Sequence, residues 1–352
     1  MRTLTTRWAS RLLHASGKLA LLAALMATLA PVPAIAQDTG LPELRRDPQM
    51  VGPVPVPAAE RDIPTVVAQR WHMVTAKQTV LEGVAFDGAD LLFCDVGASR
   101  VLRVTPDGRS SVILDQPGLR AGGLALHRDG RIFAAASGGG MIGFIDPANS
   151  RLEAVVPKTA GYAPNDLVFD RNGGFYFSDF KGSAIDPVGG VYYVAPDMRT
   201  ATPVATHLAL ANGIALSPDG KYLWVTEFGR NRLLRVELKN ATTIADLGLS
   251  VAYDFIGPAP DSMRVDAEGN VYVALNGQGR VLILSPGGIP IGQILLPGRD
   301  QGHFLDSNSL ALKPGTNEVY IVASDGDHGQ GAAIFRARSF ALALPLFGDR
   351  SR

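Results

Sequence analysis

The chain has 352 residues, of which 46% are hydrophobic and 19% are charged, and its formal net charge is zero. This hydrophobic content is enough for a large core, and no block of Lys and Arg follows the leader, so nothing in the charge indicates a nucleic-acid partner. The 39 glycines and 24 prolines indicate many turns, as in an all-β protein of short strands.

The first 36 residues have the features of a secretory signal peptide. A basic segment extends to Lys18, an apolar run follows from 19 to 29, and an A-x-A sequence ends at Ala36. The apolar run is too short to cross a membrane comfortably, so an uncleaved anchor is the less favoured alternative. We therefore expect cleavage after Ala36 and a periplasmic or secreted protein that leaves the membrane.

Residues 37–65 contain six prolines and are predicted to be an extended lead-in without regular secondary structure. Residues 66–80 follow with the alternating pattern of a strand. Cys94 is the only cysteine, so an intramolecular disulfide is impossible. Its apolar neighbours predict that it packs as a small buried hydrophobe.

From residue 82 onward, one pattern of apolar strand, Gly-containing turn and aromatic-rich strand occurs six times. The copies begin at Glu82, Gly122, Asn165, Asn212, Asp261 and Asn308. A strand-and-turn repeat of 40–49 residues is typical of a four-stranded propeller blade. The predicted fold is all-β, a six-bladed β-propeller of four-stranded antiparallel blades, forming one domain over residues 66–345. The strand at 66–80 is expected to complete the last blade and close the ring.

The first strand of each blade lines the channel of a propeller, so the residue that opens each copy is presented at one mouth. Five of the six opening residues carry side-chain oxygens, and the exception is Gly122. A single Asn or Asp at a strand entry commonly bonds its own backbone, but five in register favour a shared function. Glu82 and Asp261 facing one axis would repel each other and lose hydration unless a cation compensated them.

Carboxylate and amide oxygens without His or Cys predict Ca²⁺, with Mg²⁺ second; Mn²⁺ and Zn²⁺ remain open as substitutes. The small residues Gly122, Ser262 and Ser309 are interpreted as leaving the mouth open for a substrate. His303 stands five residues before Asn308 and could overhang the same mouth, the alternative being an ordinary loop histidine. The polar residues that end the second strands are interpreted as turn-making groups: Asp95, Asp179, Glu227, Asn276 and Asp325.

Several long stretches resemble the senescence-marker-protein/gluconolactonase/luciferin-regenerating-enzyme family. Among them are NDLVFDRNGGFYFSDFKG (165–182), ANGIALSPDGKYLWVTE (211–227) and PDSMRVDAEGNVYVALNGQGRV (260–281). The likeness covers most of residues 80–340 and is greatest to the family's calcium-dependent, drug-responsive lactonases. It implies a six-bladed propeller with a divalent metal in the channel.

Carried over by position, the resemblance implies specific site residues. The implied metal ligands are Glu82, Asn165, Asn212 and Asp261, with Ser262 adjoining them. The resemblance also implies that Asp261 is the proton donor and that Asp166 lies in the site. Relatives that act on sugar lactones carry an Arg at the place of Ala163, so this chain departs from that subgroup.

Three functions remain open from the sequence. The first is a calcium-dependent lactonase with Asp261, Asp166 and His303 as catalytic candidates and a small lactone or ester as substrate. The second is a paraoxonase-like hydrolase of aryl esters or phosphotriesters. The third is a binding propeller whose metal only braces the blades. The sequence does not set the oligomeric state.

Overall fold

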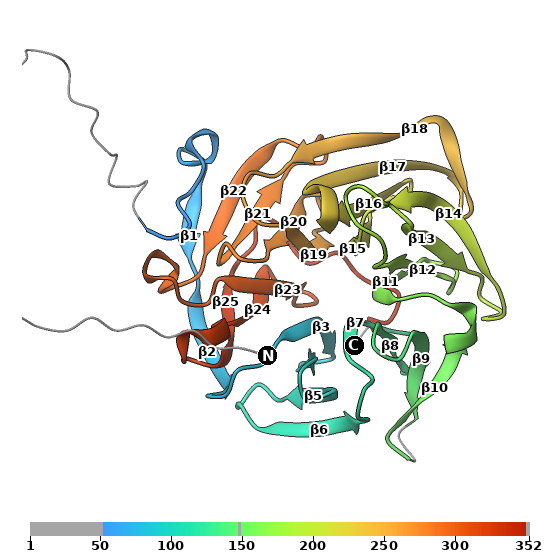
Figure 1. The fold of residues 1–352 in the computed structure, drawn as a ribbon, viewed down its shortest axis with the longest axis horizontal. Coiled ribbons are helices and arrows are strands. Elements are labelled where there is room, and N and C mark those ends of the chain that lie inside the picture. The colour runs from blue at the N-terminus through green and yellow to red at the C-terminus, as the bar shows by residue number, and fades with distance from the viewer. Residues whose placement is uncertain (1–51, 147–148, 350–352) are drawn as a thin grey trace, which may run out of the picture. The chain divides into compact units, whose positions relative to one another are not determined.

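Six sheets, antiparallel except for one added edge strand, surround a central channel (Figure 1) in a computed structural model that describes residues 52–146 and 149–349. The prediction of an all-β, six-bladed propeller is therefore confirmed. The predicted signal peptide lies outside the described residues, as does the start of the lead-in. None of the described helices is long and apolar enough to cross a membrane.

Four blades follow one another along the chain, each with its first strand innermost. Blade 1 contains β3 (Leu81–Asp87), β4 (Asp90–Asp95), β5 (Arg100–Val104) and β6 (Ser110–Asp115). Blade 2 contains β7 (Ala121–Leu126), β8 (Ile132–Ala136), β9 (Met141–Asp146) and β10 (Arg151–Val156). Blade 3 contains β11 (Pro164–Phe169), β12 (Phe175–Asp179), β13 (Gly189–Val194) and β14 (Ala201–Leu208). Blade 4 contains β15 (Ala211–Leu216), β16 (Tyr222–Glu227), β17 (Arg232–Asn240) and β18 (Thr243–Asp254).

The last two blades include strands from the start of the chain. Blade 5 contains β19 (Pro260–Val265), β20 (Val271–Leu275), β21 (Arg280–Leu284), β22 (Pro290–Leu295) and β1 (Thr65–Val67). Blade 6 contains β23 (Asp306–Leu312), β24 (Glu318–Ser324), β25 (Ala332–Arg338) and β2 (Gln69–Thr75). The antiparallel pairing of β2 with β25 confirms that a strand before the first repeat closes the ring.

Short 3₁₀ helices occupy some of the connections: η2 (Ala58–Glu60), η3 (Lys158–Ala160), η4 (Phe228–Arg230), η5 (Arg299–Gln301) and η6 (Gly326–His328). The hairpins between first and second strands are made by the predicted turns. In the turn after β15, for example, Gly220 has φ +72°, which a residue without Cβ adopts without strain.

The apolar residues of the strands pack between neighbouring blades rather than around one centre. Tyr176 and Val191 of blade 3, for instance, share a buried cluster with Ile214 and Val225 of blade 4. Each fully buried aliphatic side chain of this kind contributes about 1.5–3 kcal/mol. The blades are thus fixed by their flanks, and the channel is left to polar and small residues near one mouth.

The described part of the lead-in departs from the purely extended segment that was expected. It forms η2, and β1 adds to blade 5 as a fifth strand, parallel to β22. Glu60 is buried and pairs with Arg280 at 2.5 Å, and Gln293 donates to the Glu60 carbonyl oxygen at 2.9 Å. The lead-in therefore anchors to the outer edge of blade 5.

Candidate metal centre in the channel

All six first strands are irregular at the residue that opens the repeat. Their pairing with the second strand shifts register there, as between Glu82 and Ala85 in blade 1 or between Ala211 and Ile214 in blade 4. A β-bulge re-aims the local side chain and leaves backbone groups of the ladder unpaired. The bulges therefore free the opening residues from the regular alternation of the strand.

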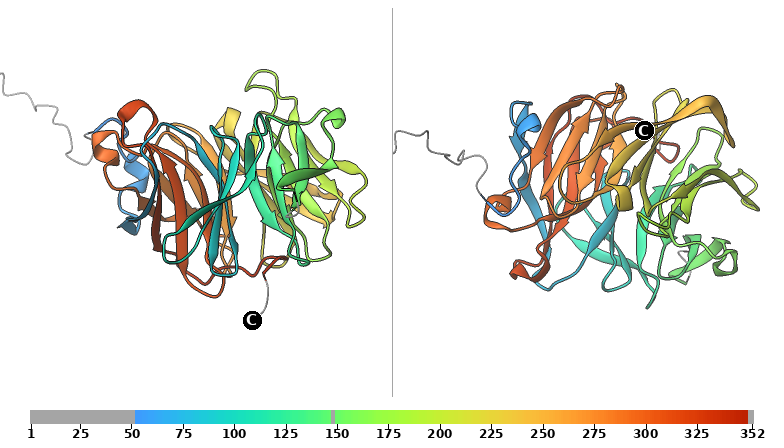
Figure 2. Two further views of the ribbon diagram at one scale, coloured as in Figure 1. Left: turned by 90° about the horizontal axis from the view of Figure 1, so that it is seen from below. Right: turned by 45° about the horizontal axis from the view of Figure 1, so that its top comes forward.

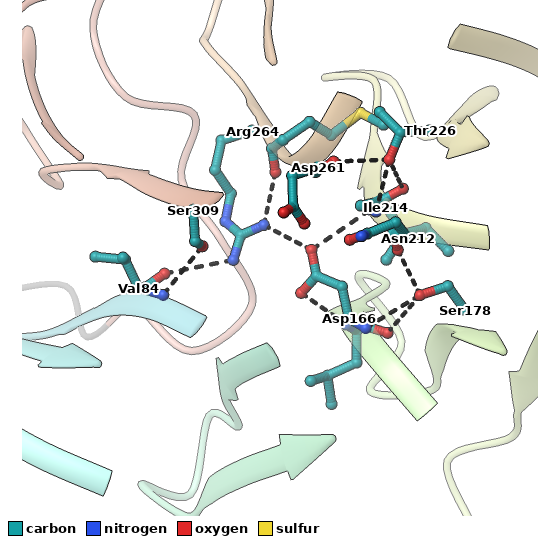
Figure 3. Close-up of polar contacts among 12 residues, drawn as sticks. Val84, Asp166, Ser178, Asn212, Ile214, Thr226, Asp261, Arg264 and Ser309 are labelled. Carbon is teal, nitrogen blue, oxygen red and sulfur yellow. Dashed lines mark hydrogen bonds and ion pairs between the residues drawn. The ribbon is translucent and has the colours of Figure 1, made fainter. Parts of the chain in front are cut away.

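Hydroxyl groups from the ends of the second strands satisfy backbone groups left by these bulges (Figure 3). Thr226 Oγ1 accepts from Gly213 N–H at 2.7 Å and donates to the Asp261 carbonyl oxygen at 2.7 Å. Ser178 Oγ likewise accepts from Asp166 N–H at 3.0 Å and donates to the Asn212 carbonyl oxygen. Each hydroxyl thus links its own blade to the opening residue of the next blade.

Three opening residues carry buried oxygens that have no hydrogen-bond partner. Glu82, Asn212 and Asp261 are 8%, 2% and 4% exposed. Glu82 Oε2, Asn212 Oδ1 and Asp261 Oδ1 are three of only six such unpartnered side-chain atoms among the described residues. Figure 3 shows the Asn212 and Asp261 side chains pointing toward a common space. An unsatisfied buried polar group costs about 1–3 kcal/mol, so a cation among these oxygens would be strongly favoured.

Burial and mutual repulsion perturb both acids of this group. Burial raises the pKa of Glu82 well above its ordinary value, and the charges of Asp261 and Asp166 raise it further. The pKa of Asp261 is also raised, first by burial and then by Asp166, although a hydrogen bond from Asn212 opposes the shift. Without a cation, both carboxyl groups hold protons far more readily than exposed acids do.

Asp166 is held by an ion pair across the channel that the sequence did not predict (Figure 3). Arg264 Nη1 lies 3.0 Å from Asp166 Oδ2, and Arg264 Nη2 donates to the Val84 carbonyl oxygen at 3.3 Å. The Arg264 side chain therefore connects blade 5 to blades 3 and 1. Alignment of the six repeats could have singled out Arg264, because the other five copies carry small apolar residues at the equivalent position: Ala85, Ala125, Val168, Ala215 and Ala311.

The remaining predicted ligands lie beside this group. Asn165 is half-buried next to Asp166, and Ser262 is buried with its backbone N–H bonded to the Asp261 carboxylate. Among the residues that the structure describes, no three His, Cys, Asp or Glu side chains form a metal-binding group by themselves. A metal at this place therefore depends on the Asn oxygens as well as on the two carboxylates.

Comparison with known proteins agrees with this reading of the fold. A family model described as the SMP-30/Gluconolactonase/LRE-like region matches residues 80–302. The chain belongs to this family. Lactonase drp35 of Staphylococcus saprophyticus is 42% identical over 296 residues, which cover 82% of this chain and 91% of that protein. Lactonase drp35 of Staphylococcus aureus is 40% identical over 301 residues, covering 82% and 92%.

Solved structures share the propeller at much lower identity. Regucalcin of Agrobacterium tumefaciens, described as a calcium-binding protein, has a TM-score of 0.67 and 19% identity, covering 81% of this chain and 99% of that one. A luciferin-regenerating enzyme has a TM-score of 0.64 and 18% identity, covering 80% and 99%. These two likenesses establish the fold of the family member described here.

Gly122, Ser262 and Ser309 do not open the mouth, so that interpretation was wrong. A Cβ on Gly213 would lie 2.6 Å from the Asp261 carbonyl oxygen, and one on Gly122 would lie 2.9 Å from that of Asn165. Ser309 is fully buried, and its Oγ accepts from Val84 N–H at 3.3 Å. These residues are small because adjacent first strands approach each other closely around the channel.

His303 lies in the loop before β23 and is only partly buried. Its Nδ1 is 3.0 Å from Asp325 Oδ1, and its ring centroid is 6.1 Å from that of His328 in η6. The contacts described for His303 are thus with other loop residues of blade 6 rather than with the three unpartnered oxygens.

The acids that end the second strands are structural, as the sequence indicated. The carboxylates of Asp179, Glu227 and Asp325 accept backbone N–H groups from the loops that lead into the first strands of their own blades. The donors are Ala163 at 2.7 Å, Ala209 at 2.8 Å and Phe304 at 2.8 Å. Asp95 also fits this role, since it accepts the Thr79 hydroxyl from the loop before β3, and it accepts Ala98 N–H at 2.9 Å from the loop after its own strand. These bonds fix the loops that deliver the opening residues to the channel.

Cys94 takes the place in blade 1 that Ser178 and Thr226 take in blades 3 and 4, directly before the terminal acid. It is completely buried in an apolar cluster, which confirms its prediction as a small buried hydrophobe. A Cβ on Gly83 would lie 2.8 Å from its sulfur, so the thiol fills the space beside the blade 1 bulge.

Proposed function

We propose that this protein is a calcium-dependent lactonase, a hydrolase that opens the ester bond of a small lactone at the channel mouth. The observation that carries the proposal is the set of three unpartnered buried oxygens on Glu82, Asn212 and Asp261. The drp35 lactonases, at 42% and 40% identity over most of the chain, support the reaction class. The calcium-binding description of regucalcin supports the choice of ion.

Glu82, Asn212 and Asp261 would hold the cation, with Asn165 and Ser262 at its side. All of these donors are oxygens, which suit Ca²⁺ and its 6–8 ligands, and the five residues leave places for water and substrate. When bound, the cation supplies positive charge that polarises the lactone carbonyl. Asp261 is the proposed proton-transferring group, because one of its oxygens is free of hydrogen bonds.

In the proposed reaction the oxygen of a water molecule bonds to the lactone carbonyl carbon. Asp261 accepts a proton from this water as the ring C–O bond breaks, and then delivers the proton to the departing ring oxygen. The product is a hydroxy acid. Asp166 is less suited to this role, since Arg264 and Leu167 N–H, at 3.0 and 2.9 Å, already bond its carboxylate. Its proposed contribution is to hold Arg264 beneath the site.

His303 remains a candidate for exchanging protons between the site and bulk water. Its Nδ1 is engaged by Asp325, so Nε2 is the nitrogen left for a mobile proton. A His303→Gln variant that lowers turnover without weakening calcium binding supports this role. Unchanged turnover assigns the residue to loop structure.

The test is hydrolysis of a panel of aliphatic and aromatic lactones by purified protein in EDTA and in CaCl₂. We expect activity only with calcium, and its loss in Glu82→Gln. Full turnover in EDTA would contradict the proposal. Calcium binding without hydrolysis of any ester would favour a metal-braced binding propeller. A preference for aryl esters or phosphotriesters would favour paraoxonase-like chemistry.

We also propose that the protein is exported and cleaved after Ala36. The support is the basic segment, apolar run and A-x-A pattern of the leader. N-terminal sequencing of the mature protein from the periplasm or the medium tests this. A mature chain that retains the leader in the membrane fraction refutes it.

A further inference from the structure

The mouth opposite the candidate metal centre contains a cavity of about 420 Å³. Each first strand has its opening residue near its start and ends in a turn at the other mouth. The cavity is lined by the later residues of these strands and by the turns that follow. Its apolar lining includes Phe86, Leu126, Phe169, Leu216 and Leu312. It is therefore separate from the group formed by Glu82, Asn212 and Asp261.

The cavity exists because the side chains lining the channel are small. Ala85, Ala125 and Val168 line it at the repeat position where blade 5 carries Arg264. Arg264 also lines it, but its guanidinium is bonded to the Asp166 carboxylate and to the carbonyl oxygens of Met263 and Val84. The inner end of the cavity thus presents a charge that is already compensated.

Two charged side chains at the rim are engaged with the protein in the same way. Asp170 accepts from Asn172 N–H at 2.8 Å and from the Tyr193 hydroxyl at 2.7 Å. Arg171 donates to the Pro218 carbonyl oxygen. At Arg264, Asp170 and Arg171 a charged ligand would lose hydration without gaining a free partner, whereas an apolar ligand has no such hydration to lose. The chemistry of the walls favours an uncharged, apolar molecule.

The C-terminal segment crosses this mouth as a strap, residues 343–348, visible in red along one face of the propeller (Figure 2, left). At one end, Ala343 N–H donates to the Thr316 carbonyl oxygen at 2.8 Å. At the other end, the Phe347 ring lies 5.6 Å from that of Phe169, and the Arg128 guanidinium lies 4.4 Å over it. Leu346, between these anchors, also lines the cavity and is 48% exposed.

We propose that this cavity is a second ligand site, which takes one uncharged apolar small molecule beneath the strap. Its volume lies within the range of about 300–1,000 Å³ that is usual for small-molecule sites. The leucine and phenylalanine side chains supply the binding energy, and the strap gains an apolar partner when the site is filled. The proposal does not depend on the metal or on the lactonase reaction.

The experiment titrates the mature protein with N-phenyl-1-naphthylamine, an uncharged apolar fluorophore, in EDTA and in CaCl₂. We expect saturable binding of one dye per chain with the same affinity in both buffers and in Glu82→Gln. Ala125→Phe fills the cavity and should weaken binding at least tenfold. Ala59→Phe, the same change on the exposed lead-in, should leave binding unchanged. Phe347→Ala frees one end of the strap and should speed dye release.

A crystal pressurised with xenon gives a readout that needs no variant, since apolar cavities bind this gas. Xenon density between Phe86, Phe169 and Leu216 supports the site. Absence of both xenon and saturable dye binding overturns it. Equal dye binding by wild type and a folded Ala125→Phe, or displacement of the dye by calcium, also overturns it. If Ala125→Phe does not fold, the smaller change Ala85→Leu takes its place with the same expected loss.

Discussion

Replacing Asp261 with Asn should stabilise the metal-free protein while abolishing its response to calcium. Burial raises the pKa of Asp261 from 3.8 to about 8. At pH 7 the carboxyl is therefore ionised in the unfolded chain but protonated in the fold. Folding at pH 7 must therefore include the uptake of a proton, which lowers the free energy of unfolding. The difference between pH 7 and the unfolded pKa of 3.8, at 1.36 kcal/mol per pH unit, makes this penalty roughly 4 kcal/mol as an upper limit. Asn carries no charge and removes the penalty.

The pH dependence of this effect has a definite sign. A carboxyl whose pKa is raised by folding contributes most to the stability of the fold at low pH, where it is protonated in both the folded and the unfolded chain. This contribution is lost as the pH rises from the unfolded pKa through the folded pKa. In EDTA, the advantage of Asp261→Asn should therefore grow between about pH 4 and pH 8 and then stay constant. At about 2 °C per kcal/mol, the melting temperature should rise by up to about 8 °C at pH 7.

Calcium should narrow the difference between the two proteins at pH 7. An ion at a hundred times its Kd stabilises the wild type by about 2.7 kcal/mol, and the variant should lose most of this gain. Scanning calorimetry at pH 5, 7 and 9, in EDTA and in CaCl₂, measures both effects. The reasoning fails if Asp261→Asn is less stable than wild type in EDTA, or if it keeps the full calcium shift.

Asp266 provides a matched control in the same blade. It is also buried, but its carboxylate accepts from Asn270 N–H, Asn270 Nδ2 and the Tyr272 hydroxyl, each at 2.9 Å. Asp266→Asn should lower stability by about 1–3 kcal/mol in both buffers and leave the calcium shift intact. A gain of stability in Asp261→Asn and a loss in Asp266→Asn would distinguish an acid of the candidate metal site from a structural acid.

Three further predictions concern the surroundings of the site. Arg264→Met leaves the Asp166 charge unpaired and should lower the free energy of unfolding by about 3–5 kcal/mol. In a double-mutant cycle measured by denaturation, adding Asp166→Leu should recover part of this loss. Additive losses would contradict the pairing. Thr226→Val removes the hydroxyl between blades 4 and 5 and should weaken calcium binding at the neighbouring Asp261, as measured by calorimetric titration; an unchanged Kd would contradict its positioning role. Because protons compete for both acids of the site, calcium affinity should increase with pH at least as far as about 8, the pKa of Asp261. A Kd that is constant between pH 6 and 9 would contradict the raised pKa values.

The period of the sequence was sufficient to predict the blades and the residues that meet at the channel. Positions that are equivalent in a repeat become equivalent around the axis, so Glu82, Asn212 and Asp261 could be predicted to come together without knowing any contact. The bulges that free them could not be predicted, since a register shift depends on which hydroxyls of the second strand replace the missing ladder bonds. Arg264 was missed because its partners Asp166 and Val84 are 98 and 180 positions away.

The misreading of the small residues has the same origin. Gly122, Ser262 and Ser309 were interpreted as leaving an open mouth, but a Cβ on Gly122 would meet the backbone of the neighbouring first strand, and both serines are buried. A repeat shows which positions are constrained but not which side of the strand imposes the constraint. Likewise, the prolines of the lead-in argued against regular structure, whereas Glu60 and its buried partner Arg280 fix part of it on blade 5.

The charges at the centre of the channel fit one divalent cation. The acids that raise the pKa of Glu82 are Asp261 and Asp166, and the one base that lowers it is Arg264. With all three acids ionised, these four side chains carry a net charge of minus two, since Arg264 cancels one carboxylate. A monovalent ion would leave a buried negative charge, and two divalent ions would leave an excess of positive charge. In the proposed metal site, Arg264 therefore lowers by one the positive charge that the ion must supply, and Arg264→Met should increase the positive charge required at this mouth.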